Sequence, residues 1–232
     1  MSNTLPTVPM LGGGDFAVRR ILCIGRNYAE HAAEMGADVR EPPFHFTKSL
    51  PALFLADGPT SWPYPVATSD CHHELEVVIA LGCGGAGLTP AQGAACVVGW
   101  GLGLDMTRRD VQGAAKKAGR PWAAGKDFDG SAICTPLVPA AVFGAPTEGP
   151  LVLCVDGVER QRGDLAQLLW SVPELIAQLS AWMTLGPGDL IYTGTPSGVG
   201  PVGVGQTLVG TFPGLPTLTV TVVAREVADV VD

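Results

Sequence analysis

The sequence of 232 residues is long enough for one large domain with a substantial buried core, or for two small ones. Hydrophobic residues make up 47% of it and charged residues 16%, a balance that excludes an intrinsically disordered chain. The 22 acidic residues outnumber the 14 lysines and arginines, and the net charge of −8 argues against a nucleic-acid-binding face, which needs a surplus of basic residues.

The sequence also bears on location and redox state. Its first twenty residues contain no continuous apolar segment typical of signal peptides, and no run of about 18 apolar residues could span a membrane. Its six cysteines include no C-x-x-C pair, so in a chain this long we expect free, mostly buried thiols. We therefore predict a cytoplasmic protein without membrane contact.

Strands and short helices alternate in the first half of the chain. The apolar run at 20–25 predicts a buried strand, and the Ala- and Glu-rich segment 27–35 predicts one or two helical turns. A second strand is predicted at 75–81. A Thr-Pro pair then opens a predicted helix over 90–98, and a Gly-rich apolar strand follows at 101–106.

In the second half, residues 139–150 are predicted to form a long surface loop. Leu and Val at 151–155 run through Asp156-Gly157 into Val158, which is a hairpin signal. Helical apolar spacing covers 172–183, and a Pro-Gly-Asp turn leads into a strand at 190–193. Thr alternates with Leu or Val at 217–222, as in a half-buried strand. With 31 glycines and 20 prolines spread along the chain, we predict a β-rich α+β fold with a few short helices.

The most informative segment is the His-Glu-Leu-Glu stretch at 73–76. Side chains at i and i+2 of a strand share one face, so Glu74 and Glu76 project together while Leu75 faces the core. Two adjacent carboxylates repel each other unless a cation lies between them. The alternative interpretation is a solvated edge strand, on whose wet face Glu is ordinary.

Asp105 interrupts an apolar, Gly-rich strand, where an aspartate is seldom buried without a partner. Together with Glu74 and Glu76 it would form an all-oxygen ligand set, which suits Mg²⁺, Mn²⁺ or Ca²⁺ better than Zn²⁺. Three protein ligands would leave coordination positions for water and substrate. The alternative role for Asp105 is a capping or turn residue.

Several other polar residues are candidates for substrate chemistry. Arg108 and Arg109, followed by Gln112, could recognise a carboxylate, although one of the arginines could simply neutralise a neighbouring aspartate. His31 and Glu34 lie at i and i+3 of a predicted helix and could act as a general base, or be solvated surface residues.

Lys126 lies among glycines and aromatic residues and could meet developing negative charge, or be an ordinary surface lysine.

Two glycine-rich segments resemble nucleotide-binding loops. Residues 82–87 match G-x-G-x-x-G, but the preceding strand carries glutamates where a central parallel strand is apolar on both faces, and the next helix starts later at Thr89-Pro90. Residues 194–200 lack the G-K-[ST] of a P-loop. Their amides and Thr195 could still bind a carboxylate.

These segments, in this order, resemble the fumarylacetoacetate hydrolase family. The matching stretches are Gly25-Arg26-Asn27-Tyr28 with His31 and Glu34, then residues 73–76, 104–110, 121–126, 172–176 and 187–200. They span nearly the whole chain between about residues 20 and 202.

The resemblance implies a mixed β-sandwich roll of the family's C-terminal domain type, formed by a single catalytic domain over 21–232 after an N-terminal extension over 1–20. It also implies a homodimer and Mg²⁺ or Mn²⁺ bound by Glu74, Glu76 and Asp105. His31 and Glu34 would form a catalytic dyad on a lid helix, Lys126 would face the substrate oxyanion, and Arg26, Arg109, Gln112 and Thr195 would bind a small 2-oxo acid.

Within this family the sequence is most similar to the short acylpyruvate hydrolases, including fumarylpyruvate hydrolase. A second arginine, Arg108, stands where many members have a small residue, and it could hold the distal carboxylate of a dicarboxylic substrate. We therefore expect metal-dependent cleavage of a C–C bond that releases pyruvate. The alternatives are an oxaloacetate decarboxylase, an isomerase or hydratase of a dienoate from aromatic catabolism, and a non-catalytic binding protein.

Overall fold

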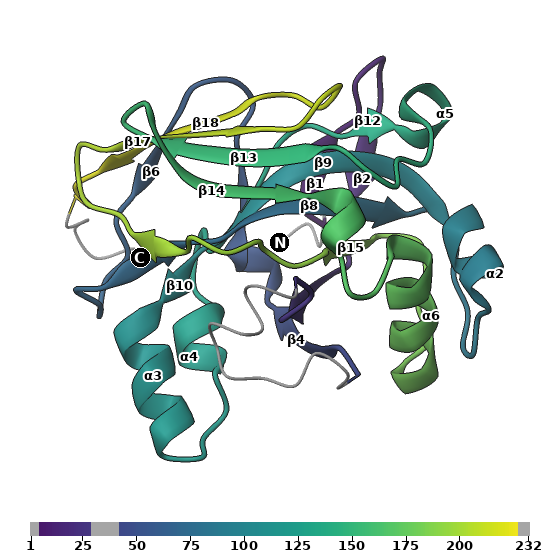
Figure 1. The fold of residues 1–232 in the computed structure, drawn as a ribbon, viewed down its shortest axis with the longest axis horizontal. Helices are drawn as coiled ribbons and strands as arrows, with labels where there is room; N and C mark the ends of the chain where they lie inside the picture. Colours follow the sequence, from purple (N-terminus) through teal and green to yellow (C-terminus); the bar gives the residue numbers. More distant parts are fainter. Residues whose placement is uncertain (1–4, 29–41, 227–232) are drawn as a thin grey trace.

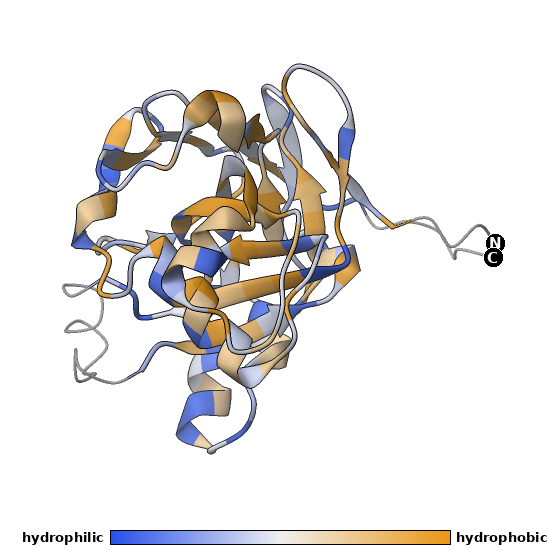
Figure 2. Cartoon of the chain, turned by 90° about the vertical axis from the view of Figure 1, so that its right-hand side faces the viewer, coloured by the Kyte–Doolittle hydropathy of each residue, from blue (hydrophilic) through white to orange (hydrophobic). Residues whose placement is uncertain are grey.

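In the computed structural model, residues 5–28 and 42–226 are described (Figure 1). Strands dominate this part of the chain and the helices are short, which confirms the predicted β-rich α+β class. None of the helices in these two ranges combines the length and the apolar character needed to cross a membrane. Figure 2 shows the central strands mostly in the colour of apolar residues, as expected for a buried core.

A large mixed sheet forms the centre of the molecule. In spatial order it contains β4 (Phe44–Lys48), β3 (Arg20–Gly25), β15 (Asp189–Tyr192), β8 (Leu75–Leu81), β9 (Val97–Asp105), β11 (Ala132–Cys134) and β5 (Leu53–Leu55), and β12 (Val138–Pro139) also pairs with β9. β15 is parallel to β3 and β11 is parallel to β5, whereas β8 is antiparallel to both of its neighbours.

A second sheet lies over one face of the first (Figure 1). Its order is β14 (Val158–Asp164), β13 (Pro150–Val155), β17 (Thr207–Thr211), β18 (Leu218–Val223) and β6 (Thr60–Pro63). Leu75 and Val77 of β8 belong to the same buried cluster as Leu153 of β13 and Val220 of β18. The two sheets therefore form the predicted sandwich, and alternate residues of β8 face its core.

The opposite face of the large sheet is also covered. β1 (Thr7–Pro9) pairs with β2 (Asp15–Ala17), and Val8 and Val18 pack with Ile21 and Val78 in a second buried cluster. β8 is consequently buried at every position. β8 is buried on both faces although it follows Glu74 and carries Glu76, but it is antiparallel to both of its neighbours, which is incompatible with a dinucleotide-binding fold.

A small three-stranded sheet and the helices complete the structure. β7 (Cys71–His73) pairs with β10 (Thr107–Arg108) and β16 (Gly200–Pro201). The helical segments are η1 (Leu50–Ala52), α2 (Pro90–Ala95), α3 (Arg109–Lys117), α4 (Ala123–Lys126), α5 (Ala140–Phe143), η2 (Leu165–Gln167) and α6 (Val172–Trp182). Thr89 is the N-cap of α2, as the Thr-Pro pair predicted, and it also forms a capping box with Gln92.

Three sequence predictions need correction. The helix predicted over 90–98 ends at Ala95, and β9 already begins at Val97. The segment 139–150 contains the short helix α5, so it is not one continuous loop. Cys83 and Cys96 form a disulfide instead of free thiols, because the amide of Gly82 bonds to the carbonyl of Cys96 and holds the two segments together. Cys23, Cys71, Cys134 and Cys154 are free.

Candidate functional site

Strands β8 and β9 bring three carboxylates to one face of the large sheet. Leu75 is opposite Leu104 in the antiparallel register, and the amide of Asp105 donates to the carbonyl of Glu74 at 2.9 Å. Each of the carboxyl groups of Glu74, Glu76 and Asp105 offers an oxygen within 4.8 Å of the others, and all three residues are buried. The alternative of a solvated edge strand is therefore wrong.

Gly103 lies opposite Glu76 on this face. A Cβ atom at this position would come within 2.5 Å of the Tyr192 ring and 2.7 Å of the Ile133 carbonyl oxygen. The glycine therefore allows Tyr192 to pack against the sheet beneath the carboxylates, where its hydroxyl donates to Ile133 at 2.9 Å.

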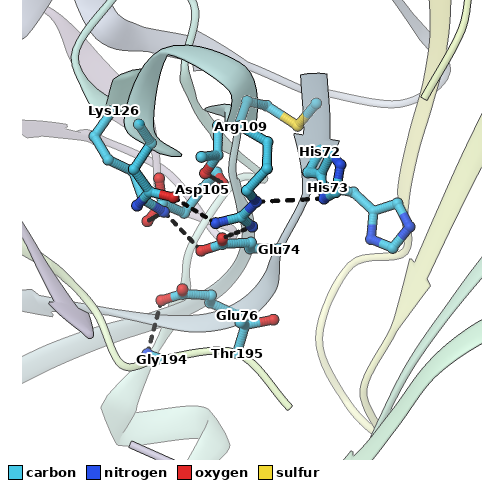
Figure 3. A network of polar contacts seen from close by, with 12 residues as sticks. His72, His73, Glu74, Glu76, Asp105, Arg109, Lys126, Gly194 and Thr195 are labelled. Atoms are coloured by element: carbon cyan, nitrogen blue, oxygen red, sulfur yellow. Dashed lines mark hydrogen bonds and ion pairs between the residues drawn. The ribbon is translucent and has the colours of Figure 1, made fainter. Parts of the chain in front are cut away.

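Lys126 bonds directly to two of the carboxylates (Figure 3). Its Nζ lies 2.7 Å from Glu74 Oε2 and 2.9 Å from Asp105 Oδ2, at the end of α4. Burial alone would lower the pKa of Lys126, but the charges of Asp105 and Glu74 raise it above its ordinary value. The residue is 3% exposed, so the surface-lysine alternative is wrong and a charged ammonium group faces the site.

A second buried ammonium group, that of Lys48, was missed in the sequence. Its Nζ lies 2.8 Å from Asp105 Oδ1 and donates to the carbonyls of Met106, Lys126 and Ser131. Lys48 ends β4, in which Phe44, Phe46 and Lys48 alternate along one face. A lysine continuing an aromatic strand face was the signal that could have identified it.

Arg109 approaches the same cluster from the first turn of α3. Its guanidinium donates to Glu74 Oε1, to Gln112 Oε1 at 2.6 Å and to His72 Nδ1 at 3.4 Å. Gln112 is about one helical turn further along α3, so the two side chains lie on the same face of the helix. Gly125 permits close contact between α3 and α4, because a Cβ there would lie 2.8 Å from the backbone nitrogen of Gln112.

The glycine-rich segment after β15 does bind a carboxylate, but one from the protein itself. The amide of Gly194 donates to Glu76 Oε2 at 2.7 Å. The hydroxyl of Thr195 donates to the carbonyl of Leu75 at 2.9 Å and accepts a bond from Gln161 at 2.8 Å. The loop therefore fixes Glu76, and Gln161, which the sequence analysis did not single out, holds the loop against β8.

The carboxylates open into a small hollow with about 30 Å³ of free volume, enough for an ion or a water molecule. Arg26, Arg109, Gln112, Lys126 and Thr195 line it together with the three acids, Ile24, Gly25, Phe44, Phe46 and Trp122. Arg108 is not among these residues, because its guanidinium lies 4.3 Å from the centre of the Phe128 ring. His31 and Glu34 lie outside the described residues.

The chemistry of this cluster fits a divalent cation. Oδ1 of Asp105 is buried but accepts no hydrogen bond from the described residues, since the N–H groups of Lys48 are directed to backbone carbonyls. Burial, followed by the charges of Asp105 and Glu74, raises the pKa of Glu76 well above its ordinary value. A bound Mg²⁺ or Mn²⁺ would satisfy the oxygen ligands and relieve this repulsion.

Two known proteins are similar to this chain over most of its length. Oxaloacetate tautomerase YcgM of Escherichia coli (strain K12) is 40% identical over 201 residues, which cover 86% of this chain and 91% of that protein. Fumarylpyruvate hydrolase of Ralstonia sp is 42% identical over 183 residues, which cover 78% and 93%.

The crystal structure of fumarylpyruvate hydrolase from Pseudomonas aeruginosa in complex with Mn²⁺ and pyruvate superposes with a TM-score of 0.94. The two chains are 44% identical, and the match covers 97% of this chain and 98% of that one. Residues 20–223 also match the family described as fumarylacetoacetate (FAA) hydrolase C-terminal. This chain belongs to the fumarylacetoacetate hydrolase family.

Proposed function

We propose that the protein is a divalent-metal-dependent hydrolase that cleaves a 3-acylpyruvate, such as fumarylpyruvate, into pyruvate and a carboxylic acid. The main support is the buried cluster in which Lys126 bonds to Glu74 and Asp105 beside Glu76. The similarity to fumarylpyruvate hydrolases at 42% and 44% identity adds to it.

Glu74, Glu76 and Asp105 would hold the metal ion, which we propose to be Mg²⁺ or Mn²⁺. When bound, the ion would supply Lewis acidity toward the oxygens of the 2-oxo acid. The relative from Pseudomonas aeruginosa contains Mn²⁺ and pyruvate.

The charges around the hollow favour a dianionic substrate. Lys48, Lys126 and Arg109 contact Glu74 and Asp105, and their three positive charges equal the three negative charges of Glu74, Glu76 and Asp105. A divalent cation would therefore leave two net positive charges in the cluster, and Arg26, which also lines the hollow, adds another. In this proposal Arg26 takes the role of binding the distal carboxylate that the sequence had suggested for Arg108.

The proposed reaction consumes one water molecule. The His31–Glu34 pair, which lies outside the described residues, would remove a proton from this water, and the resulting hydroxide would attack the distal acyl carbonyl. The C–C bond then breaks, so the acyl group leaves as a carboxylic acid and the bonding electrons remain on the pyruvate enolate. The Lys126 ammonium would stabilise the enolate oxygen until carbon is protonated to give pyruvate.

A second candidate activity is tautomerisation or decarboxylation of oxaloacetate. The 40% identity to the tautomerase of Escherichia coli favours it. These reactions also pass through an enol or enolate, so Lys126 would have the same task. They require no attacking water.

The proposal is tested by supplying fumarylpyruvate, acetylpyruvate and oxaloacetate separately with Mg²⁺, and by following pyruvate release and the ultraviolet absorbance of enol-oxaloacetate. Cleavage of fumarylpyruvate that EDTA abolishes is the expected result. Conversion of oxaloacetate alone would replace the hydrolase with the second candidate. Arg26→Ala should raise KM for fumarylpyruvate more than for acetylpyruvate, whereas Arg108→Ala is the matched control and should not discriminate between them.

A further inference from the structure

A line of polar side chains connects the outside of the protein with the carboxylate cluster. Asp70 Oδ1 lies 2.9 Å from His72 Nε2, and His72 Nδ1 accepts a bond from Nε of Arg109 at 3.4 Å. Arg109 in turn donates to Glu74 (Figure 3). The side chain of Asp70 is 45% exposed and that of His72 is 17% exposed, so the line runs from solvent to the buried acids.

The partners of His72 determine which ring nitrogen carries the proton. An ionised carboxylate only accepts hydrogen bonds, so Nε2 must present its proton to Asp70. The guanidinium of Arg109 only donates, so Nδ1 must present its lone pair. The imidazole is therefore neutral and protonated on Nε2, and the opposite tautomer would direct an N–H at the guanidinium.

The backbone holds these groups in register. His72 pairs with Thr107 across β7 and β10, and the amide of Arg109 donates to the carbonyl of Asp70 at 2.7 Å. The side chains of Asp70, His72 and Arg109 thus come from two segments whose separation is fixed by main-chain bonds. A change in the orientation or tautomer of the His72 imidazole would therefore change the orientation of the Arg109 guanidinium.

Arg109 has N–H groups that could donate to a ligand in the hollow. A guanidinium has five N–H groups, and His72, Gln112 and Glu74 take one from each of Nε, Nη1 and Nη2. Within residues 5–28 and 42–226 the two remaining N–H groups have no recorded acceptor. Because Arg109 lines the hollow, they can reach a bound carboxylate if the guanidinium keeps this orientation.

We propose that Asp70 and His72 form a positioning pair for Arg109. Asp70 holds His72 in its Nε2–H tautomer, and the free Nδ1 of His72 then fixes the orientation of the Arg109 guanidinium toward the 2-oxo acid. This role rests on the proposed function for its substrate. The tautomer and the binding of a small dicarboxylate can be measured without any turnover.

The first measurement is the tautomer itself. Nitrogen-15 NMR of protein labelled at its four histidines, with Mg²⁺ present, should show His72 with Nδ1 unprotonated and Nε2 protonated. The resonance is assigned with His72→Asn. Asp70→Ala should shift it toward a tautomer mixture, whereas Asp57→Ala, at an exposed site, should leave it unchanged. A His72 protonated on Nδ1 in the wild type would overturn the proposal.

The second measurement is calorimetric binding of oxalate to the Mg²⁺-loaded protein. His72→Leu removes the acceptor and should weaken oxalate binding about tenfold or more, the range expected for one charge-assisted hydrogen bond. His72→Asn keeps an acceptor near the position of Nδ1 and should bind within about threefold of the wild type. The Kd of Mg²⁺ should change little in either variant.

The pattern of results separates the explanations. Equal loss of oxalate binding in His72→Leu and His72→Asn, or a parallel loss of Mg²⁺ binding, would indicate a merely structural histidine and overturn the proposal. Tautomer and oxalate results as expected, with no pyruvate released from any acylpyruvate, would reject the proposed hydrolase and leave the positioning pair in place.

Discussion

Lys48 and Asp105 form a buried ion pair in which Nζ lies 2.8 Å from Oδ1, although the two residues come from strands at different places in the large sheet. The same ammonium group donates to three backbone carbonyls, including that of Lys126. Lys48 thus contacts Asp105, a candidate metal ligand, and the backbone carbonyl of Lys126. The ammonium group of Lys126 in turn bonds to Glu74 and Asp105.

Replacing Lys48 by Met should destabilise the metal-free protein strongly. The change removes one donor from each of three backbone carbonyls and one of the two ammonium groups beside Asp105, so we expect a loss of roughly 3–5 kcal/mol in the free energy of unfolding. Urea denaturation in EDTA measures it. Lys116→Met, at an exposed site on α3, is the control and should stay within about 0.5 kcal/mol of the wild type.

Divalent metal should stabilise the folded protein through Asp105. At a free Mn²⁺ concentration of about 100 times Kd, linkage predicts a gain of about 2.7 kcal/mol, seen as a rise in the unfolding midpoint. Asp105→Asn should lose this response because one of the three proposed carboxylate ligands is gone. A variant that responds to Mn²⁺ as the wild type does would place the metal elsewhere.

The stability of the metal-free protein should depend on the ionisation of Glu76. Burial and the neighbouring acids raise its pKa, so above the unfolded-state pKa of about 4.3 the folded form binds more protons than the unfolded form. The contribution of Glu76 is therefore fully present at low pH and is lost as pH rises through the folded-state pKa. Glu76→Gln should abolish this part of the slope in urea titrations in EDTA, and saturating Mg²⁺ should reduce it in the wild type.

Asp189 should show the opposite pH dependence. Burial alone would raise the pKa of Asp189. Hydrogen bonds from Arg19, Arg20 and the amide of Gly186 lower this pKa by more than burial raises it, so the net shift is downward. Its stabilising contribution is present above the unfolded-state pKa of about 3.9 and is lost as pH falls through the folded-state pKa.

Asp189→Asn should therefore cost about 2–3 kcal/mol at pH 7. Thermal unfolding should show the gap between variant and wild type closing in strongly acidic buffer. Asp15→Asn, on the exposed side of β2, provides the matched control, and an equal effect of both substitutions would contradict the assigned role.

Much of the fold could be predicted because the strand signals are local. The strand at 20–25 has the predicted bounds, the Asp156-Gly157 turn joins β13 to β14, and α6 begins at Val172 behind its capping box. The boundary after α2 was missed because the short apolar run from Ala94 to Val98 can continue a helix or begin a strand, and periodicity does not distinguish the two. The disulfide could not be predicted because it depends on which segments the sheet brings together.

The candidate site was predicted where one strand supplied both the spacing and the chemistry. Glu74 and Glu76 share a face through the two-residue period, and Asp105 joins them through the register of β9. Lys48, His72 and Gln161 were missed because the partners that connect them to the site are distant in sequence: Met106 is 58 residues from Lys48, Arg109 is 37 from His72, and Thr195 is 34 from Gln161. The position of Arg108 depends on the aromatic ring of Phe128, which spacing does not reveal.

Gly103 has a consequence for how this protein could diverge. Any side chain there would collide with Tyr192 and with the main chain of β11, so the surface beneath the carboxylates offers almost no freedom for mutation. Residues lining the hollow farther from the sheet, such as Phe44 and Trp122, are only half-buried and have more room to change. New substrate preferences should therefore evolve by substitution of these residues, while the floor of the site remains constant.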